Sequence, residues 1–154
     1  MISPALEAVS AAGLDHRVIR YGAVRNALEA AVARGVELAD VVKTIVVRRA
    51  DNNYVFVLTP GDRVISWPKL RTLLGVNRLS MPDADTAKAA TGYERGTITP
   101  FGSTTAWPVI ADERLRGRTI TLGTGEHGAA VALSADEAIE ALAGAYADVT
   151  EPEA

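Results

Sequence analysis

The stretch VVKTIVV at residues 41–47 decides the fold, because it is a short apolar run that contains a single charged residue, Lys43. Short runs of apolar, β-branched residues are typical of a strand buried in a sheet. An ammonium group inside such a strand is unfavourable by several kcal/mol unless it is paired or faces a cleft. Two interpretations follow: Lys43 is an edge residue whose stem reaches water, or it is a functional cation.

Further elements are predicted on both sides of this strand. Turn residues at 51–53 and the apolar run 54–58 predict a strand that returns and forms a hairpin. Other strands are predicted at 16–20, 108–111, 119–123 and 129–133. Helices are predicted at 3–13, 26–35, 66–75, 80–90 and from 134 onward, from their capping residues and terminal glycines. We expect residues 150–154 to be frayed, and the fold class to be α+β, with a mixed, mostly antiparallel sheet and helices packed around it.

The longest irregular stretch predicted from the sequence covers residues 92–107 and begins with GYERGTITPFG at 92–102. Its glycines, threonines and prolines do not suit a regular element. Long loops of this kind are functional more often than not. Glycines at 96 and 102 would let main-chain N–H groups approach a substrate carbonyl and stabilise an oxyanion.

Composition excludes several classes of function. With 154 residues, 48% hydrophobic and 23% charged, we expect one domain over residues 1–154. No segment approaches the roughly 20 apolar residues that cross a bilayer, and the N-terminus lacks a signal-peptide pattern, so we expect no membrane partner and a cytoplasmic protein. The chain has no cysteine, which excludes disulfides and thiol nucleophiles.

A formal net charge of −3 argues against binding of nucleic acid over the whole surface. An RNA partner would have to be held by local clusters of basic residues, each of which can equally be a solvated face. The clusters are Arg48 with Arg49, Lys69 with Arg71, and the group Arg114, Arg116 and Arg118.

Other catalytic patterns find little support. The serines lack a Gly-x-Ser-x-Gly frame, no phosphate-binding glycine motif is present, and the carboxylates are scattered, so we predict neither a metal nor a cofactor. Of the two histidines, His16 is interpreted as an ordinary surface residue. His127 lies between Gly125 and Gly128 in a predicted turn and is a candidate for chemistry, the alternative being a turn histidine without a role.

Several of these segments, in this order, resemble the YbaK/ProX family of aminoacyl-tRNA deacylases, relatives of the editing domain of bacterial prolyl-tRNA synthetases. The matching segments are 41–47, 70–76, 91–93, 96–102, 107–112 and 125–128. Thr97 departs from the family pattern, where many members have a second glycine, and Thr99 stands where serine or proline is common. Residues 20–25 match the family's entry segment poorly. The resemblance implies a barrel-like sheet surrounded by helices.

The resemblance also implies an activity: hydrolysis of the ester of a mischarged tRNA that carries a small amino acid of the alanine, cysteine or serine type. Its implied partners are the 3′ acceptor end of that tRNA and an aminoacyl-tRNA synthetase such as prolyl-tRNA synthetase. The implied catalytic residues are Lys43, Gly96 and His127. The implied substrate-binding residues are Thr44, Thr97, Ile98, Thr99, Pro100, Gly102, Gly125 and Gly128.

Two points stay open in this interpretation. No side chain is an obvious general base, and the resemblance implies that a ribose hydroxyl of the tRNA or a group on the amino acid helps to activate the attacking water. The alternative function is a non-catalytic module of the same fold that captures aminoacyl-tRNA or a synthetase.

Overall fold

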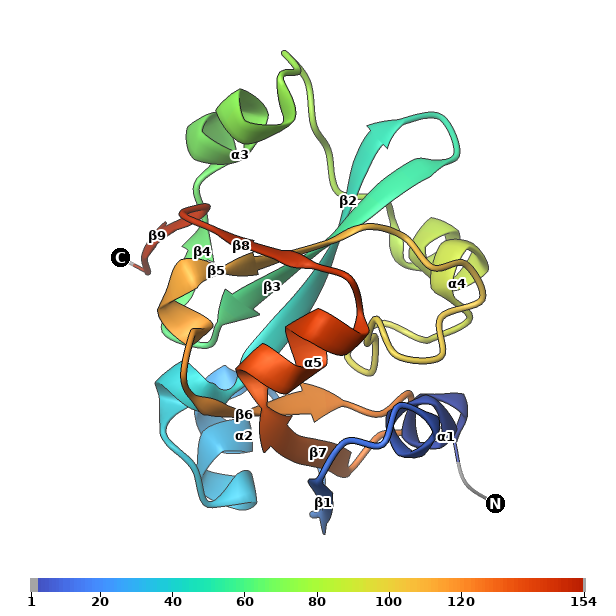
Figure 1. Ribbon diagram of the computed structural model, residues 1–154, viewed down its shortest axis with the longest axis vertical. Helices are drawn as coiled ribbons and strands as arrows, with labels where there is room; N and C mark the ends of the chain where they lie inside the picture. Colours follow the sequence, from blue (N-terminus) through green and yellow to red (C-terminus); the bar gives the residue numbers. More distant parts are fainter. Residues whose placement is uncertain (1–2, 154) are drawn as a thin grey trace.

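The predicted Lys43 strand is β2 (Val42–Ala50), which runs through the middle of the molecule in the computed structural model (Figure 1); the structure describes residues 3–153. It pairs antiparallel with β3 (Asn53–Pro60) and so forms the predicted hairpin. On its other side β3 pairs parallel with β5 (Val109–Asp112), which pairs parallel with β8 (Ala145–Ala147). These strands form one mixed sheet.

A second, antiparallel sheet has the order β1 (His16–Arg20), β7 (Ala129–Ser134) and β6 (Thr119–Gly123). A parallel bridge between Val41 and Thr121 joins its β6 edge to the start of β2. The two sheets therefore continue into one another around a shared core, and the predicted fold class, a mixed and mostly antiparallel sheet surrounded by helices, is confirmed.

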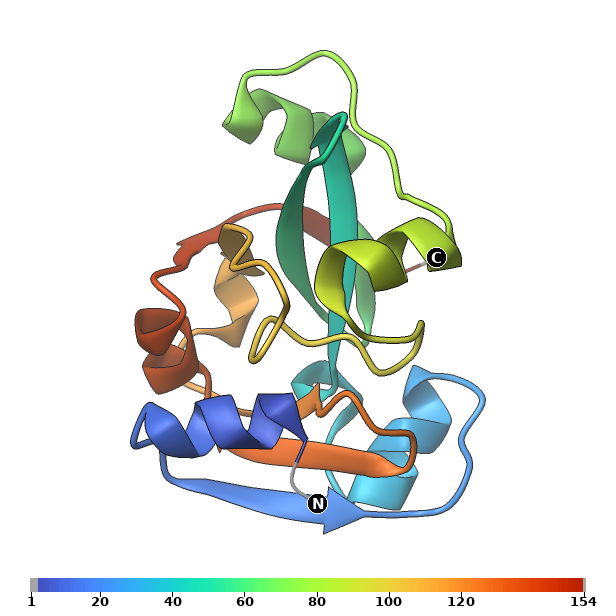
Figure 2. The ribbon, with the colours of Figure 1, turned by 90° about the vertical axis from the view of Figure 1, so that its right-hand side faces the viewer.

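The helices lie on the outside of these sheets (Figures 1 and 2). They are α1 (Pro4–Ala11), α2 (Ala27–Arg34), α3 (Trp67–Leu74), α4 (Ala84–Thr91) and α5 (Ala135–Ala141), with short 3-10 turns η1 (Leu38–Asp40) and η2 (Glu113–Leu115). Each α-helix begins after a residue whose side-chain oxygen accepts a hydrogen bond from a backbone N–H three residues later. These residues are Ser3, Asn26, Ser66, Asp83 and Ser134.

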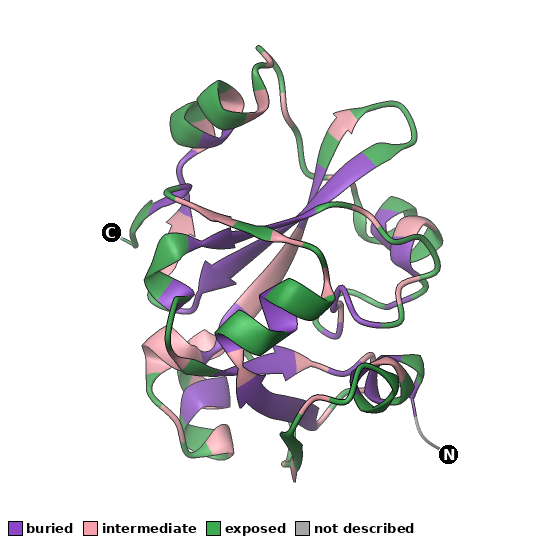
Figure 3. Ribbon diagram, in the orientation of Figure 1, coloured by how far each residue is buried: buried purple, intermediate pink, exposed green. Residues whose placement is uncertain are grey.

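The hydrophobic core lies on both faces of β3, which is buried along its whole length except at Asn53 (Figure 3). Phe56 and Leu58 contribute to the larger core between the two sheets. Val55 and Val57 face a smaller core beneath α3. Burial on both faces explains why this strand reads as a continuous apolar run rather than as an alternating pattern.

Three expectations about the chain were incomplete or wrong. Residues Thr150–Pro152, expected to be frayed, form strand β9, which pairs antiparallel with β4 (Arg63–Ile65); Ala154 lies outside the described residues. Ser80 does not begin a helix, because its backbone pairs with that of Arg48 and α4 begins only after Asp83. Strand β8 was not predicted. Three-residue strands carry little pattern of their own and form only when a distant partner completes them.

Within residues 3–153, none of the helices has the length and apolarity needed to cross a membrane.

Candidate functional site

Lys43 lies near the start of β2, on the face that carries Val41 and Val47, whereas Val42 and Val46 point into the larger core. Its side chain is half-buried, and Nζ donates a hydrogen bond to the backbone oxygen of Arg63 at 2.7 Å. None of the ion pairs formed among residues 3–153 includes Lys43. The ammonium group is therefore not neutralised by a carboxylate of the fold.

Two buried hydroxyl groups next to Lys43 have no hydrogen-bond partner. Thr59 lies directly opposite Lys43 on β3 and is only 1% exposed, and its Oγ1 is unpaired. The Oγ1 of Thr44, the next residue along β2, is also unpaired. A buried polar atom without a partner is unfavourable by about 1–3 kcal/mol. Unsatisfied groups of this kind call for an explanation, and a ligand-binding role is one.

The glycine-rich segment is irregular, as predicted, and connects α4 to β5 across the space between the hairpin and the three-stranded sheet (Figure 2). Gly96 and Gly102 have φ angles of +89° and +71°, in the region that favours glycine. The Thr97 hydroxyl donates to the Glu94 carbonyl at 2.7 Å, and the Thr99 hydroxyl accepts from the Phe101 N–H at 3.3 Å. Thr97 and Thr99, the two residues that depart from the family pattern, therefore form hydrogen bonds within the loop.

Not every N–H group of this loop is used by the fold. The N–H of Thr97 donates to the Glu94 carbonyl at 3.0 Å. In the part of the chain that the structure describes, the N–H groups of Gly96, Ile98 and Thr99 donate no hydrogen bond. Gly96 is exposed and Ile98 is half-buried, so their N–H groups suit an oxyanion site, whereas Thr99 is fully buried.

A single bridge between two strands brings the Lys43 strand towards this loop. Val41 pairs parallel with Thr121, and Lys43 and Gly123 each lie two residues further along their strands. A Cβ atom at Gly123 would lie 3.0 Å from the Thr97 carbonyl oxygen and 3.2 Å from that of Ile98. The loop backbone therefore rests on Gly123, two residues beyond the bridge to the Lys43 strand.

Sequence reasoning did not single out Gly123. The available signal was an isolated glycine at the end of an apolar strand, which often marks the close approach of another backbone segment.

Tyr93 is buried and packs against the loop, and its contacts give a structural reason for two of the predicted glycines, Gly102 and Gly125. Its hydroxyl donates to the Phe101 carbonyl at 2.7 Å, and burial raises the pKa of Tyr93 to about 12. A Cβ at Gly125 would collide with the Tyr93 ring, and one at Gly102 would lie 2.7 Å from the Tyr93 hydroxyl and 2.5 Å from the Pro4 carbonyl oxygen. A third predicted glycine, Gly128, packs against the backbone of Tyr21: an added Cβ would lie 2.8 Å from the Tyr21 carbonyl oxygen.

His127 occupies the turn between β6 and β7, as predicted, and its side chain is 72% exposed. Its Nε2 lies 3.2 Å from Oε2 of Glu94, at the start of the glycine-rich loop. The hydrogen bond from His127, with a smaller contribution from Lys88, holds the pKa of Glu94 below its ordinary value. The contact therefore links the turn to the loop, at a solvent-exposed position.

In two of the candidate basic clusters every residue except Arg71 is occupied by contacts within the fold. Lys69 and Arg114 both bind Asp148, at 3.0 and 2.9 Å. Arg118 binds Asp40 at 2.6 Å. The guanidinium of Arg116 stacks on the ring of Tyr146, with a separation of 4.3 Å. In residues 3–153 no group of three or more His, Cys, Asp or Glu residues is arranged to hold a metal ion.

Comparison with known proteins places these features in context. A family model described as an aminoacyl-tRNA editing domain matches residues 22–141. The proline–tRNA ligase of Thermosipho melanesiensis is 31% identical over 102 residues, which cover 66% of this chain and 18% of the ligase. The ligase of Caldicellulosiruptor saccharolyticus is 39% identical over 61 residues, or 40% of this chain and 10% of the ligase. The chain thus spans less than a fifth of these ligases.

Two solved structures resemble almost the whole chain. One is a candidate trans-editing enzyme for prolyl-tRNA synthetase, with 25% identity and a TM-score of 0.87 over 98% of this chain and 99% of that one. The other is a hypothetical protein, with 28% identity and a TM-score of 0.86 over 95% of this chain and 98% of that one.

Proposed function

The chain belongs to the aminoacyl-tRNA editing domain family, and from this premise we propose that it is an aminoacyl-tRNA deacylase that acts on a mischarged tRNA carrying a small amino acid. The observation that carries the proposal is Lys43, a half-buried cation without a carboxylate partner beside a loop with free N–H groups. A positive charge and backbone donors at one place suit a reaction in which negative charge develops on oxygen.

The proposed reaction is hydrolysis of the ester between the amino acid and the terminal ribose. The oxygen of a water molecule attacks the carbonyl carbon, and a tetrahedral oxyanion forms. The bond from that carbon to the ribose oxygen then breaks, and a proton passes to the ribose oxygen, which leaves a free amino acid and a free tRNA. The N–H groups of Gly96 and Ile98 would stabilise the oxyanion, each by about 3–4 kcal/mol in comparable sites.

Lys43 would supply the second electrostatic contribution. As a compact point charge it would bind either the acyl oxygen or the terminal phosphate of the tRNA. The unpaired hydroxyl of Thr59, opposite Lys43, would offer one further hydrogen bond to the substrate. We assign no protein side chain as the general base, because His127 is exposed and already bonded to Glu94. A ribose hydroxyl of the tRNA is the proposed activator of the water.

The remaining residues of the site would shape it. Thr44, Thr97, Pro100 and Gly102 would line the substrate-binding part of the strand and the loop, and His127 would border the amino-acid pocket together with Gly125 and Gly128. Small amino acids are the proposed substrates because a synthetase rejects a smaller competitor by only about 1–3 kcal/mol per methylene, so errors of this kind need separate correction. We propose tRNA mischarged by prolyl-tRNA synthetase as the source, which would place the activity in the cytoplasm.

The test is a multiple-turnover assay with purified protein and tRNAs that carry alanine, serine, cysteine or threonine. We expect release of amino acid in large excess over protein for at least one of these tRNAs. Protection of the ester in a one-to-one complex, without release, would favour the non-catalytic binding module instead.

A further inference from the structure

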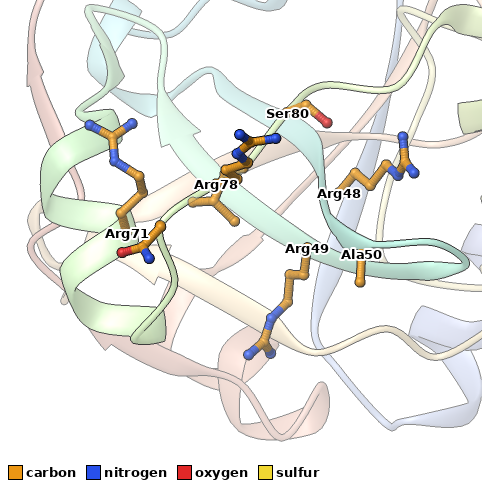
Figure 4. A pocket seen from close by; sticks show the side chains of 8 residues that line it. Arg48, Arg49, Ala50, Arg71, Arg78 and Ser80 are labelled. Atoms are coloured by element: carbon orange, nitrogen blue, oxygen red, sulfur yellow. The ribbon is translucent and has the colours of Figure 1, made fainter.

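Four arginines line an open groove at the end of β2 that lies away from Lys43 (Figure 4). Arg48 and Arg49 come from β2, Arg71 from α3, and Arg78 from the segment between α3 and α4. The groove has a volume of about 480 Å³. No acidic residue lines it, so its four arginines give a formal charge of +4 on a chain whose formal net charge is −3.

These arginines are largely free of partners within the fold. Arg48 pairs with the exposed Asp51. No ion pair among residues 3–153 includes Arg49, Arg71 or Arg78. Like charges gathered without counter-charges repel one another and do not stabilise the folded state. The cluster contrasts with Arg114 and Arg118, which bind carboxylates of the fold.

The backbone holds this groove in a defined shape. The N–H of Arg48 donates to the Ser80 carbonyl at 2.7 Å, and the N–H of Ser80 donates to the Arg48 carbonyl at 3.2 Å. The strand register shifts between Arg48 and Ala50. Successive residues of a regular strand point to opposite faces, and a bulge re-aims them. Figure 4 shows that Arg48 and Arg49 still point to opposite sides of β2, so the groove wraps around the end of the hairpin.

The arrangement of the guanidinium groups indicates the kind of ligand. Figure 4 shows that they fan out around the end of the hairpin and do not converge on one point. A neighbouring hollow that shares Arg71 and Asn77 with the groove has no acidic residue, so the concave surface continues along α3. The hollow that shares Arg48 and Ser80 is also lined by Asp51 and Asp83, which marks the end of the basic surface on that side. Spread charges along a furrow suit a chain of phosphates better than a single anion.

We propose that this arginine groove binds the sugar-phosphate backbone of the acceptor arm of tRNA, an inference that rests on the deacylase function proposed above. Six residues of β2 separate Lys43 from Arg49, or about 20 Å at roughly 3.3 Å per residue. At a few ångströms per nucleotide, the groove lies several nucleotides from the esterified end. Short aminoacyl fragments reach Lys43 but not the groove.

The first experiment measures binding of deacylated tRNA at 50 and 200 mM salt, which requires no catalytic activity. Each phosphate contact contributes about 0.7–0.9 to the slope of log K against log salt, so four contacts predict a loss of affinity of about 50- to 150-fold over this range. For the Arg49→Glu/Arg78→Glu variant, two remaining contacts predict a loss of only about 7- to 12-fold. The single variant Arg78→Glu is measured as well, because its altered side chain is exposed. It tests the groove even if the double variant does not fold.

Arg17→Glu is the matched control, because Arg17 is exposed on β1 and forms no ion pair within residues 3–153. It introduces the same change of charge as Arg78→Glu, but on β1, outside the groove. We expect it to keep the wild-type affinity and salt dependence. An equal effect of Arg17→Glu and Arg78→Glu would overturn the assignment, because only the net charge of the protein would then matter.

The second experiment compares hydrolysis of full-length aminoacyl-tRNA with that of an aminoacyl trinucleotide. We expect Arg49→Glu/Arg78→Glu to lower kcat/KM on the full-length substrate by about 10-fold or more, and on the trinucleotide by less than about twofold. An equal loss on both substrates would overturn the groove assignment.

The two proposals can fail separately. If wild-type protein hydrolyses neither substrate but the variants still lose tRNA affinity, the groove assignment is supported and the proposed hydrolysis is wrong. The groove assignment would also be overturned if the variants bound tRNA as well as the wild type does and lost affinity only for an acidic protein surface.

Discussion

The two ends of β2 both carry basic side chains, but in opposite surroundings. At one end Lys43 is a single half-buried cation whose one hydrogen bond within residues 3–153 goes to the backbone oxygen of Arg63. At the other end Arg48 and Arg49 join Arg71 and Arg78 in an open groove. A charge in a low-dielectric site acts strongly on one nearby atom, whereas charges in water act weakly and are screened by salt. One strand can therefore serve chemistry at one end and binding at the other.

The largest expected effect comes from Lys43→Met, which removes the charge and keeps most of the stem. We expect the deacylation rate to fall about 10²- to 10³-fold on long and short substrates alike, because a donor to the reacting centre is lost. Stability should change by less than about 1.5 kcal/mol, since only one hydrogen bond is lost. Deacylation rates and thermal unfolding are measured together.

Lys69→Met serves as the control for this variant, because Lys69 is bound to Asp148 and lies outside the proposed site. It should keep the wild-type rate. A Lys43→Met protein that retains full activity, or one that unfolds at a much lower temperature, would show that Lys43 is structural.

Gly123→Ala tests whether the loop must rest beside Lys43. The new Cβ would lie 3.0 Å from the Thr97 carbonyl oxygen and would push the loop by a few tenths of an ångström. Because small misplacements of catalytic groups are costly, we expect a fall in rate of about 10- to 100-fold. Gly22→Ala, where nothing lies within 4 Å, is the matched control. Equal rates for the two alanine variants would remove Gly123 from the site.

A smaller effect is expected at the arginine end of β2. Arg78→Gln should reduce the slope of log K against log salt by about one, and should do so for all tRNAs alike. The measurement is a salt titration of tRNA binding, with Arg17→Gln as the control. Loss of affinity for one tRNA only would indicate that the groove reads bases rather than phosphates.

His127→Ala sharpens the assignment of the amino-acid pocket. If His127 limits the size of the acyl group, its removal should raise the rate on a larger aminoacyl-tRNA relative to alanyl-tRNA by about 10-fold. The measurement is the set of relative rates over a panel of aminoacyl-tRNAs. An unchanged order of preference would mean that His127 only contacts Glu94.

The smallest expected effect is on stability in acid. The pKa of Glu94 is lowered in the folded protein, so the stability that this shift contributes is present at neutral pH and is lost as pH falls through and below the ordinary glutamate value of 4.5. In His127→Ala the main cause of the shift is removed, and melting temperatures should fall less steeply between pH 5 and about pH 3. Parallel curves for the two proteins would show that the His127–Glu94 contact does not form in solution.

Several structural expectations were confirmed because they rest on contacts between neighbours in the chain. The N-caps at Asn26 and Ser134 depend on a backbone N–H three residues away, and the left-handed glycine at Gly35 ends its own helix. The hairpin of β2 and β3 depends on a turn of a few residues. Local chemistry of this kind is visible in a window of ten residues.

Within the candidate site, the sequence alone was enough to identify Lys43, the 96–102 loop and the 125–128 turn as separate features, through their composition and their resemblance to an editing family. The sequence could not show which of the glycines are required by packing and which by the candidate site. Gly102 is explained by close packing against Pro4 and Tyr93, Gly125 by Tyr93 and Gly128 by Tyr21, whereas Gly123, which supports the loop, went unnoticed. A glycine looks the same in sequence whether a ligand, a ring or another backbone segment approaches it.

Sequence by itself thus determined the helices, the hairpin, the family and the cation inside an apolar strand, because propensity, capping and short motifs are properties of adjacent residues. Only the tertiary structure decided that β9 pairs with β4, that the 96–102 loop rests on Gly123, and that Arg71 and Arg78 join Arg48 and Arg49 in one groove. These arrangements join residues far apart along the chain. Their geometry follows from how sheets and helices pack around a shared core, and no local pattern encodes that packing.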